Sequence, residues 1–365
     1  MKLFARKLFT GKELLQNRSV IITDGIVTEI AEAQADFTPD FTTDILAPGL
    51  LDVQIYGAGG PIFSAALSEE SLSAMEDALF AEGCTGFFAT LATNTAEVFV
   101  KAIEVAKRYW PKRKGNFLGL HLEGPFLNAK RKGAHPEEFI RKANLDELKS
   151  WVKNGEGVIR MMTIAPELQD EAIVDYLNSE NIVISAGHSD AKFNEAVQFF
   201  DKVQAATHLY NAMPQMHHRQ PGLIPAIFRK KPFTSVVADG IHVDFTMINL
   251  AKQLLGDKLF YITDAVTETP GGAYQHVFTC DRFTMPDGTL SGSCLSMLKA
   301  VQNGVEHIGI PLEESLRMAS VIPGQLIGDT HYGQIAEDRP VNAIGFSEDF
   351  HPQITLLKTW VKTAS

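Results

Sequence analysis

Four apolar stretches of this 365-residue chain each end on a polar residue that can bind a metal or move a proton. The four are Glu123 after FLGLHL, His188 after ISAG, His208 after AAT and Asp264 after LFYIT. Each stretch has the composition of a buried strand. In a parallel α/β barrel, the loops at the C-terminal ends of the strands converge on one face, which carries the active site. The pattern therefore predicts a barrel that gathers these four side chains on one rim.

The order of the predicted elements agrees with a barrel. Strand-like and helix-like segments alternate between residues 47 and 328, and their number suits an eightfold (β/α)8 barrel. One helix is predicted over 68–83 from its capping serine and its apolar face. Residues 1–46 and 329–365 consist of short strand-like runs separated by turns. We expect these two ends to meet in one small β domain.

Composition narrows the class of protein. The net charge is -11, and no basic run offsets it, so the sequence argues against nonspecific nucleic-acid binding. Cys84, Cys280 and Cys294 have no CxxC spacing, which is unlike a disulfide framework and indicates a reducing compartment. No run has the length and apolarity of a signal peptide or a membrane span. We expect a soluble cytoplasmic protein.

Two histidines and a glutamate are the candidate metal ligands. Taken singly, Glu123 reads as a salt-bridged loop acid, and His188 or His208 as a hydrogen-bonded core residue. Two histidines that close consecutive strand–helix units are harder to explain in this way. With Glu123 they form the His₂Glu set of catalytic zinc sites, which leaves one position open for water. A metal held there lowers the pKa of bound water from about 15.7 towards roughly 7.

The other polar candidates each have two interpretations. Asp264 either caps the next segment or acts as a general base. His135 is either a solvated loop residue or a group that stabilises a developing oxyanion. Arg219 and His242 are either surface residues or contacts for an anion such as phosphate. His121 lies two residues before the predicted ligand and is interpreted as a hydrogen-bonded residue of the barrel interior, not as a ligand.

Seven motifs together resemble the N-acetylglucosamine-6-phosphate deacetylase family of the amidohydrolase superfamily. They are LAPGLLDVQIYGAGG, HLEGPFLNAKRKGAH, SAGHSDA, THLYNAMP with RQPG, ADGIHVD, ITDA and DGTLSGS, and they occur in the family's order from about residue 45 to about 325. The resemblance implies a (β/α)8 barrel with a small β-sandwich built from both termini. It implies hydrolysis of N-acetyl-D-glucosamine 6-phosphate to D-glucosamine 6-phosphate and acetate, in amino-sugar catabolism.

The resemblance also implies roles for individual residues. Glu123, His188 and His208 are expected to hold the metal. Asp264 is expected to activate water and then protonate the leaving amine, and His135 to contact the acetyl carbonyl.

At the phosphate end, the resemblance implies that His242 contacts the phosphate together with the backbone around Asn211 and Ala212. Arg219 matches an arginine that reaches the phosphate of the neighbouring subunit's substrate. The expected partner is therefore a second copy of the chain, in a homodimer.

Departures from the family pattern are informative. Many amidohydrolases carry His-x-His on the first strand and bind two metals, whereas this chain has Gln54 and Tyr56. Neither is a good ligand for a transition metal. The chain resembles the branch that uses one metal, with Zn²⁺ expected and Fe²⁺, Co²⁺ or Mn²⁺ as alternatives. Tyr56 stands where Asn is frequent, and its role is left open. Near the C-terminus AEDRPVNAIGF replaces the usual motif.

Three alternatives remain beside the leading function. One is deacetylation of another N-acetylhexosamine 6-phosphate, such as the galactosamine isomer. A second is a different amidohydrolase reaction, such as hydrolysis of a cyclic amide. A third is a non-catalytic assembly protein, which is disfavoured because such a protein would be expected to lose ligands or the base.

Overall fold

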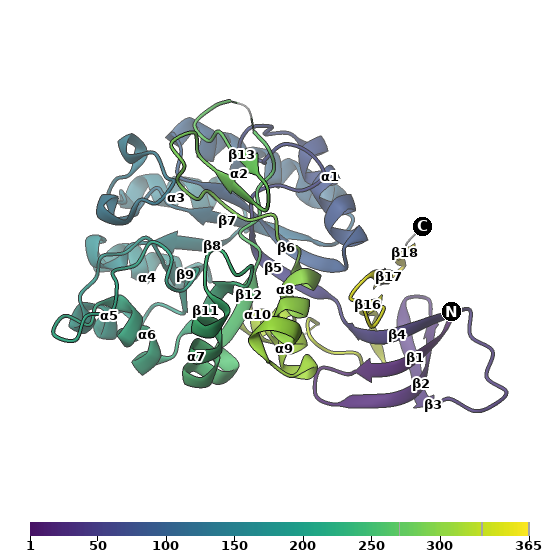
Figure 1. Cartoon of the computed structure of the whole chain (residues 1–365). Helices are drawn as coiled ribbons and strands as arrows, with labels where there is room; N and C mark the ends of the chain where they lie inside the picture. The colour runs from purple at the N-terminus through teal and green to yellow at the C-terminus, as the bar shows by residue number, and fades with distance from the viewer. Residues whose placement is uncertain (270, 330, 364–365) are drawn as a thin grey trace.

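The computed structural model describes residues 1–269, 271–329 and 331–363. Its centre is a sheet of eight parallel strands in the order β12-β11-β10-β9-β8-β7-β6-β5, as the barrel prediction requires (Figure 1). Those strands are β5 (Leu50–Ile55), β6 (Cys84–Ala92), β7 (Phe117–Glu123), β8 (Ile159–Ile164), β9 (Val183–Ala186), β10 (Ala205–Ala206), β11 (Phe233–Val237) and β12 (Leu259–Ile262).

The first and last strands of this sheet meet, which nearly closes the barrel. The backbone N–H of Asp264 donates to the carbonyl of Gln54 at 3.0 Å, and that of Tyr56 donates to the carbonyl of Ala265 at 2.9 Å. Most residues of β5, β6, β7 and β12 are buried. Strands that are covered on both faces account for the continuous apolar runs in the sequence.

Helices cover the outside of the barrel (Figure 1). They are α1 (Glu69–Ala81), α2 (Ala96–Tyr109), α3 (Leu145–Gly155), α4 (Glu171–Ser179), α5 (Phe193–Phe199), α6 (Leu223–Lys230), α7 (Phe245–Leu255), α8 (Met297–Asn303), α9 (Leu312–Ala319) and α10 (Val321–Leu326). The helix predicted over 68–83 is α1. Its Ser68 cap accepts a hydrogen bond from the backbone of Ser71, which satisfies one of the free N–H groups at a helix start.

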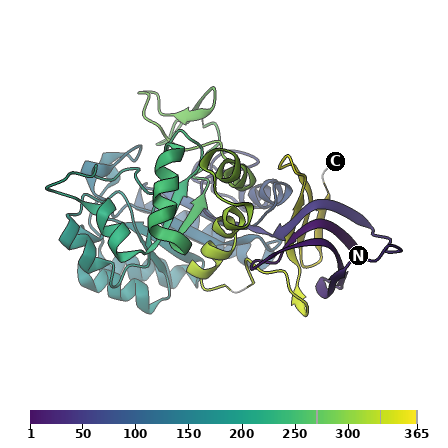
Figure 2. The same ribbon diagram turned by 60° about the horizontal axis from the view of Figure 1, so that its bottom comes forward.

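Both ends of the chain share a second sheet, which lies beside the barrel (Figure 2). Its order is β15-β3-β2-β1-β4-β16-β17-β18. The strands are β1 (Lys2–Phe9), β2 (Leu14–Thr23), β3 (Ile26–Glu32), β4 (Phe41–Pro48), β15 (Arg339–Pro340), β16 (Asn342–Phe346), β17 (Pro352–Leu357) and β18 (Trp360–Thr363). The expected meeting of the two ends is confirmed by the antiparallel pairing of β4 with β16.

Two details of the terminal sheet differ from the sequence pattern. The run YGQIAEDRP reads as a strand, but only β15 pairs, because Gly333 and Asp338 have positive φ and turn the chain away from extended geometry. The boundary expected between residues 46 and 47 falls inside β4. The division into 1–46, 47–328 and 329–365 therefore stays a prediction.

A small hairpin of β13 (Val277–Thr279) and β14 (Arg282–Thr284) stands out from the barrel (Figure 2). The three cysteines are free thiols, of which only Cys84 is buried. Among the residues that the structure describes, no helix is long and apolar enough to cross a bilayer.

A buried aspartate lies at the seam where the barrel closes. The carboxylate of Asp52 on β5 accepts hydrogen bonds from the backbone N–H groups of Gln54 and Thr263 and from the Thr263 hydroxyl. Burial raises the pKa of Asp52 from 3.8 to about 7, although these hydrogen bonds oppose the shift. Below about pH 7 the protonated form is therefore favoured in the folded barrel.

We predict that Asp52 makes the protein less stable as the pH rises. A carboxyl whose pKa is raised in the folded state stabilises that state fully at pH values below its ordinary pKa. This contribution is lost as the pH rises through about 7. The effect is on the order of 4 kcal/mol. Asp52→Asn should flatten the decrease in unfolding free energy, measured with urea between pH 5 and 8. The exposed Asp36→Asn is the control, and an equally flat profile there would contradict the assignment.

Candidate active site

A pocket opens at the rim formed by the C-terminal ends of the barrel strands. Its walls come from strand ends, the loops that follow them and the segment around the β13–β14 hairpin. The lining residues are Tyr56, Ile62, Ser64, Ala92, Glu123, Gly133, Ala134, His135, His188, His208, Asn211, Ala212, His242, Asp264, Val266, Tyr274, His276, Leu290, Ser291 and Gly292.

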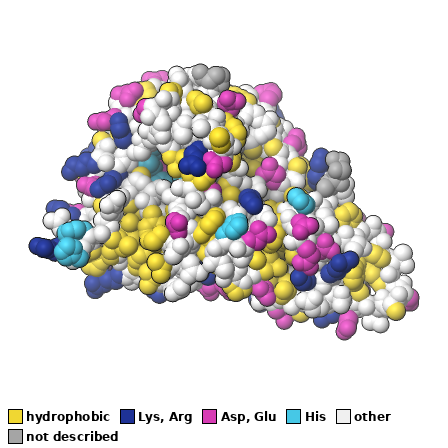
Figure 3. All heavy atoms as spheres, in the orientation of Figure 1, with side chains coloured by type: hydrophobic (Ala, Val, Ile, Leu, Met, Phe, Trp, Pro, Cys, Tyr) yellow, Lys and Arg dark blue, Asp and Glu magenta, His cyan; other side chains and the backbone are white. Residues whose placement is uncertain are grey.

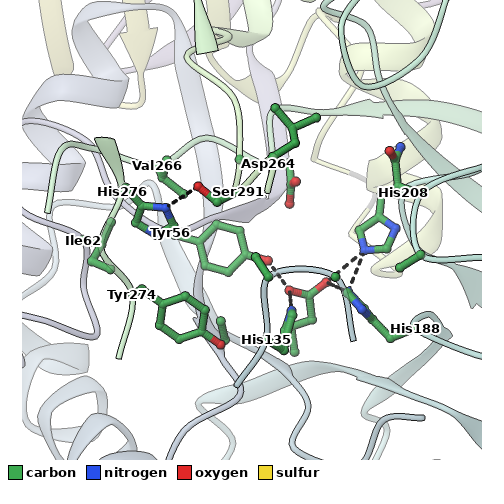
Figure 4. Close-up of a pocket in the computed structure, with 18 of the residues that line it drawn as sticks. Tyr56, Ile62, His135, His188, His208, Asp264, Val266, Tyr274, His276 and Ser291 are labelled. Carbon is green, nitrogen blue, oxygen red and sulfur yellow. Dashed lines mark hydrogen bonds and ion pairs between the residues drawn. The ribbon is translucent and has the colours of Figure 1, made fainter. Parts of the chain in front are cut away.

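Glu123 is the centre of the polar cluster in this pocket. It is the last residue of β7 and is 1% exposed. Its Oε1 lies 3.4 Å from Nε2 of His188 and 3.2 Å from Nε2 of His208. The two histidine nitrogens are 3.0 Å apart. Figure 4 shows both imidazoles pointing toward the same carboxylate. The structure therefore brings together the three predicted metal ligands.

The separations of these three atoms fit a metal ion. Zinc is bound by histidine nitrogen and carboxylate oxygen at about 2.0–2.2 Å, usually in a tetrahedron. Two ligand atoms of such a tetrahedron are about 3.3–3.5 Å apart. The observed separations of 3.0, 3.2 and 3.4 Å are close to that value. The donor set of one carboxylate and two imidazoles is also suited to a divalent transition metal.

His188 is held in the form that a metal requires. Its Nδ1–H donates to the carbonyl oxygen of Arg131 at 2.8 Å, which leaves the lone pair of Nε2 facing Glu123. Hydrogen bonds of this kind fix the tautomer and orientation of metal-binding histidines. Burial, followed by the neighbouring charge of His135, lowers the pKa of His188 to about 4. The imidazole is therefore neutral near pH 7.

The second oxygen of Glu123 has different partners. Oε2 lies 3.3 Å from Nε2 of His135 and accepts a short hydrogen bond from the hydroxyl of Tyr56. Nδ1 of His135 is 2.7 Å from the hydroxyl oxygen of Thr93. Burial by itself raises the pKa of Glu123, but neighbouring donors, with the hydrogen bond from His135 as the largest contribution, outweigh it and hold the pKa well below its ordinary value. The carboxylate is thus charged.

His135 is an alternative third ligand. One ligand atom each of Glu123, His135 and His188 lie within 4.8 Å of one another. His135, however, faces Oε2, whereas His188 and His208 both face Oε1. The set that shares one oxygen is the more compact, and we therefore favour it as the metal-binding set.

Gln54 joins this cluster to Asp264. Its side-chain nitrogen lies 3.0 Å from Oε1 of Glu123 and 2.8 Å from Oδ1 of Asp264. Burial, and then the charge of Glu123, raise the pKa of Asp264. A carboxylate with a raised pKa accepts a proton more readily.

The backbone at the strand ends is unusual. His188, His208 and Asp264 have φ values of 48°, 34° and 54°. Residues other than glycine adopt this left-handed region at a cost of about 1–2 kcal/mol, and such residues cluster at functional sites. After Glu123, Gly124 has φ 87°, and a side chain there would meet Thr93 Oγ1 at 2.1 Å. The local backbone is thus shaped to turn these side chains into the pocket.

Another part of the pocket carries groups suited to an anion. His242, Asn211 and Ala212 line it. Nδ1 of His242 is 2.6 Å from Oδ2 of Asp239, whose other oxygen accepts from the backbone of Ile241 and His242. This pairing fixes the orientation of the His242 ring.

Arg219 is the one predicted site residue that does not line the pocket. It lies in an exposed loop, where its Nε donates to His218 at 3.0 Å. Figure 3 shows no large basic patch on the face in view. Arg219 therefore lies outside the chain's own pocket.

Sequence reasoning missed the wall formed by the segment around β13 and β14. From this segment Tyr274, His276 and Ser291 line the pocket, and His276 lies 3.0 Å from the Ser291 hydroxyl. The histidine in YQHVF was a visible signal, but no strand end marked it. His121, by contrast, behaves as expected, since its two nitrogens contact the Val53 carbonyl and the Thr163 hydroxyl inside the barrel.

Comparisons with known proteins agree with this geometry. Residues 45–364 match the model of the amidohydrolase family. The chain is 31% identical over 360 residues to N-acetylglucosamine-6-phosphate deacetylase of Haemophilus influenzae, with 94% of each protein covered. It is 28% identical to N-acetylgalactosamine-6-phosphate deacetylase of Escherichia coli O157:H7, with 96% of each covered.

A solved structure is similar over the whole length. The crystal structure of N-acetylglucosamine-6-phosphate deacetylase from Pasteurella multocida superposes with a TM-score of 0.92 at 29% identity, and all of both chains is covered. The chain therefore belongs to the amidohydrolase family, and within it to the family of the N-acetylglucosamine-6-phosphate deacetylases.

Proposed function

We propose that this chain hydrolyses the acetamide of N-acetyl-D-glucosamine 6-phosphate, giving D-glucosamine 6-phosphate and acetate. The observation that carries the proposal is the convergence of Glu123, His188 and His208 within 3.4 Å of one another. Asp264 and His135 lie in the same pocket, together with anion-binding groups. Relatives named for this reaction match nearly the whole chain. A place in amino-sugar catabolism follows from the reaction.

We infer one divalent metal per chain, held by Glu123, His188 and His208. Such an ion would supply Lewis acidity, which polarises a carbonyl and makes water a nucleophile near neutral pH. Zn²⁺ suits the two imidazoles and the carboxylate, and Fe²⁺, Co²⁺ or Mn²⁺ accept the same donors. Gln54 and Tyr56 stand in and just after β5, at the positions where a second metal would need ligands.

Asp264 is the proposed general base and acid. Its carboxylate is partly buried, and its raised pKa favours uptake of a proton from the attacking water. The same proton then passes to the amine nitrogen as the C–N bond breaks. His135, which is fixed by Thr93, is placed to donate from Nε2 to the acetyl oxygen as negative charge develops there.

The phosphate of the substrate is proposed to bind at His242 and the backbone around Asn211 and Ala212. Asn211 is fixed by a 2.9 Å hydrogen bond from its N–H to the carbonyl of His208. One proposed metal ligand, His208, and the backbone part of the anion site therefore lie in one continuous loop. This connection explains how binding of the phosphate can place the amide of the sugar at the reacting groups.

We further propose a homodimer in which Arg219 reaches the neighbouring active site. The arginine is exposed and outside its own pocket. Met216 in the same loop is 50% exposed, and Leu250 and Leu254 on α7 are each 46% exposed. Hydrophobic side chains gather on the visible face where Figure 1 labels α6 and β11 (Figure 3). Exposed apolar side chains of this kind favour association.

Deacetylation of the galactosamine isomer is the second candidate. It is supported by the 28% identity to a relative with that name, against 31% for the glucosamine deacetylase. A comparison of kcat/KM on the two N-acetylhexosamine 6-phosphates decides between them. A non-catalytic assembly protein is disfavoured, because the proposed ligands and base are all present in one pocket.

We predict that the purified protein holds about one divalent metal per chain. Elemental analysis after removal of loosely bound ions should give close to one equivalent, because His188 and His208 face the same oxygen of Glu123 and Gln54 and Tyr56 offer no ligands for a second metal. Chelation should abolish turnover, and added metal should restore it. Two tightly held equivalents would contradict the proposed role of Gln54.

We predict that Asp264→Asn keeps the metal but loses turnover by about 10²–10⁴-fold, because the amide cannot accept a proton. kcat should fall while metal content stays near that of the wild type. Glu123→Gln is the informative comparison, since it should lose metal as well. Full activity in Asp264→Asn would remove Asp264 from the mechanism.

We predict that Arg219→Ala chiefly raises KM for the phosphorylated substrate, on the order of 10-fold or more, because one phosphate contact is lost. Arg6→Ala removes a distant, exposed arginine of the terminal sheet and should leave KM unchanged. Mixing Arg219→Ala with Asp264→Asn subunits tests the dimer. In a mixed dimer, the Arg219→Ala subunit keeps its Asp264 and receives Arg219 from its partner. One intact site, and therefore activity, should appear only if the arginine acts across the dimer. An unchanged KM in Arg219→Ala would refute the anion role.

A further inference from the structure

The backbone at Tyr56 is anchored on both sides of the side chain. Tyr56 is the first residue after β5, and its N–H donates to the carbonyl of Ala265 at 2.9 Å. Its carbonyl accepts from Phe63 at 2.8 Å. The ring packs against an apolar cluster that includes Ile62 and Val266. The phenol therefore projects into the pocket from a fixed base (Figure 4).

The hydroxyl of Tyr56 is bound within a short chain of hydrogen bonds. It donates to Oε2 of Glu123 and lies 3.1 Å from the side-chain nitrogen of Gln54. Because the hydroxyl donates its hydrogen bond to Glu123, the phenol is not available as a metal ligand. Its contact is also on the oxygen that faces away from His188 and His208.

The two oxygens of Glu123 are thus divided between two tasks. Oε1 faces His188 and His208, whereas Oε2 is held by the Tyr56 hydroxyl and by His135 at 3.3 Å. A carboxylate with one occupied oxygen presents the other as a single ligand atom. Among the residues that the structure describes, only His135 would restrain Oε2 without the phenol, and His135 is also needed at the acetyl oxygen under the proposed function.

We propose that Tyr56 is a positioning residue that keeps Glu123 a one-oxygen metal ligand. This inference rests on the proposed metal set of Glu123, His188 and His208. The phenol holds Oε2 away from the metal position, so that one coordination position stays open for water. It also leaves His135 free to turn from Glu123 to the substrate, because Oε2 keeps a donor when His135 moves.

The test is Tyr56→Phe, which removes the hydroxyl and keeps the ring. Partner groups of metal ligands typically contribute about 10–100-fold to metal affinity. We therefore expect the dissociation constant for Zn²⁺, measured by chelator competition, to rise on the order of 10-fold. At saturating metal, kcat should fall while KM changes little. The Co²⁺-loaded variant should absorb more weakly in the visible range, because a two-oxygen Glu123 raises the coordination number.

Tyr332→Phe is the matched control. It removes another buried phenol hydroxyl, which donates to the Thr85 carbonyl at 2.9 Å, far along the chain from the proposed ligands. Its metal affinity, Co²⁺ spectrum and kcat should equal those of the wild type. Thermal unfolding of both variants without metal separates loss of the fold from loss of the metal.

The outcomes distinguish this inference from the function on which it rests. If the wild type binds no metal, the proposed metal set fails. If the wild type binds one metal, and Tyr56→Phe binds it equally well with an unchanged Co²⁺ spectrum, Tyr56 does not position Glu123. An increase of KM alone would instead make Tyr56 a substrate contact and would also overturn the inference.

Discussion

The buried charge of Glu123 is the constraint on which the site depends. An ionised carboxylate in a protein interior is destabilising unless it is paired and hydrogen-bonded. Here the carboxylate is 1% exposed, and donors reach it from separate segments, among them Gln54 on β5 and His208 after β10. These segments approach one another only in the closed barrel. Closure of the sheet and completion of the polar cluster are therefore one requirement.

Barrel closure also explains how strained strand ends persist. His188, His208 and Asp264 each have a positive φ, which a short peptide would avoid. At Asp264 the backbone is held from both sides, since its N–H donates to Gln54 and its carbonyl accepts from Ser293. Tertiary hydrogen bonds thus hold a conformation that local preference disfavours, and the side chain is turned into the pocket as a result.

Much of the fold could be predicted because it depends on local sequence patterns. The apolar runs become β7, β9, β10 and β12, and Ser68 caps α1 as its residue type suggests. The gathering of the polar strand ends follows from barrel geometry alone. What could not be predicted depends on pairs far apart in sequence. The contact between Tyr56 and Glu123 spans 67 positions, and the pocket wall around His276 belongs to the long segment between β12 and α8, well past the end of the strand.

Gln54 shows how a site with two neighbouring carboxylates can work with one proposed metal. Glu123 and Asp264 repel each other, and in a low-dielectric interior this repulsion needs a positive partner. The amide nitrogen of Gln54 lies 3.0 Å from one carboxylate and 2.8 Å from the other. It has two hydrogens, so it can satisfy both carboxylates without adding a charge. Because it is neutral, it leaves the pKa of Asp264 raised, whereas a cation in the same place would lower it. A base that must accept a proton is better served by the amide.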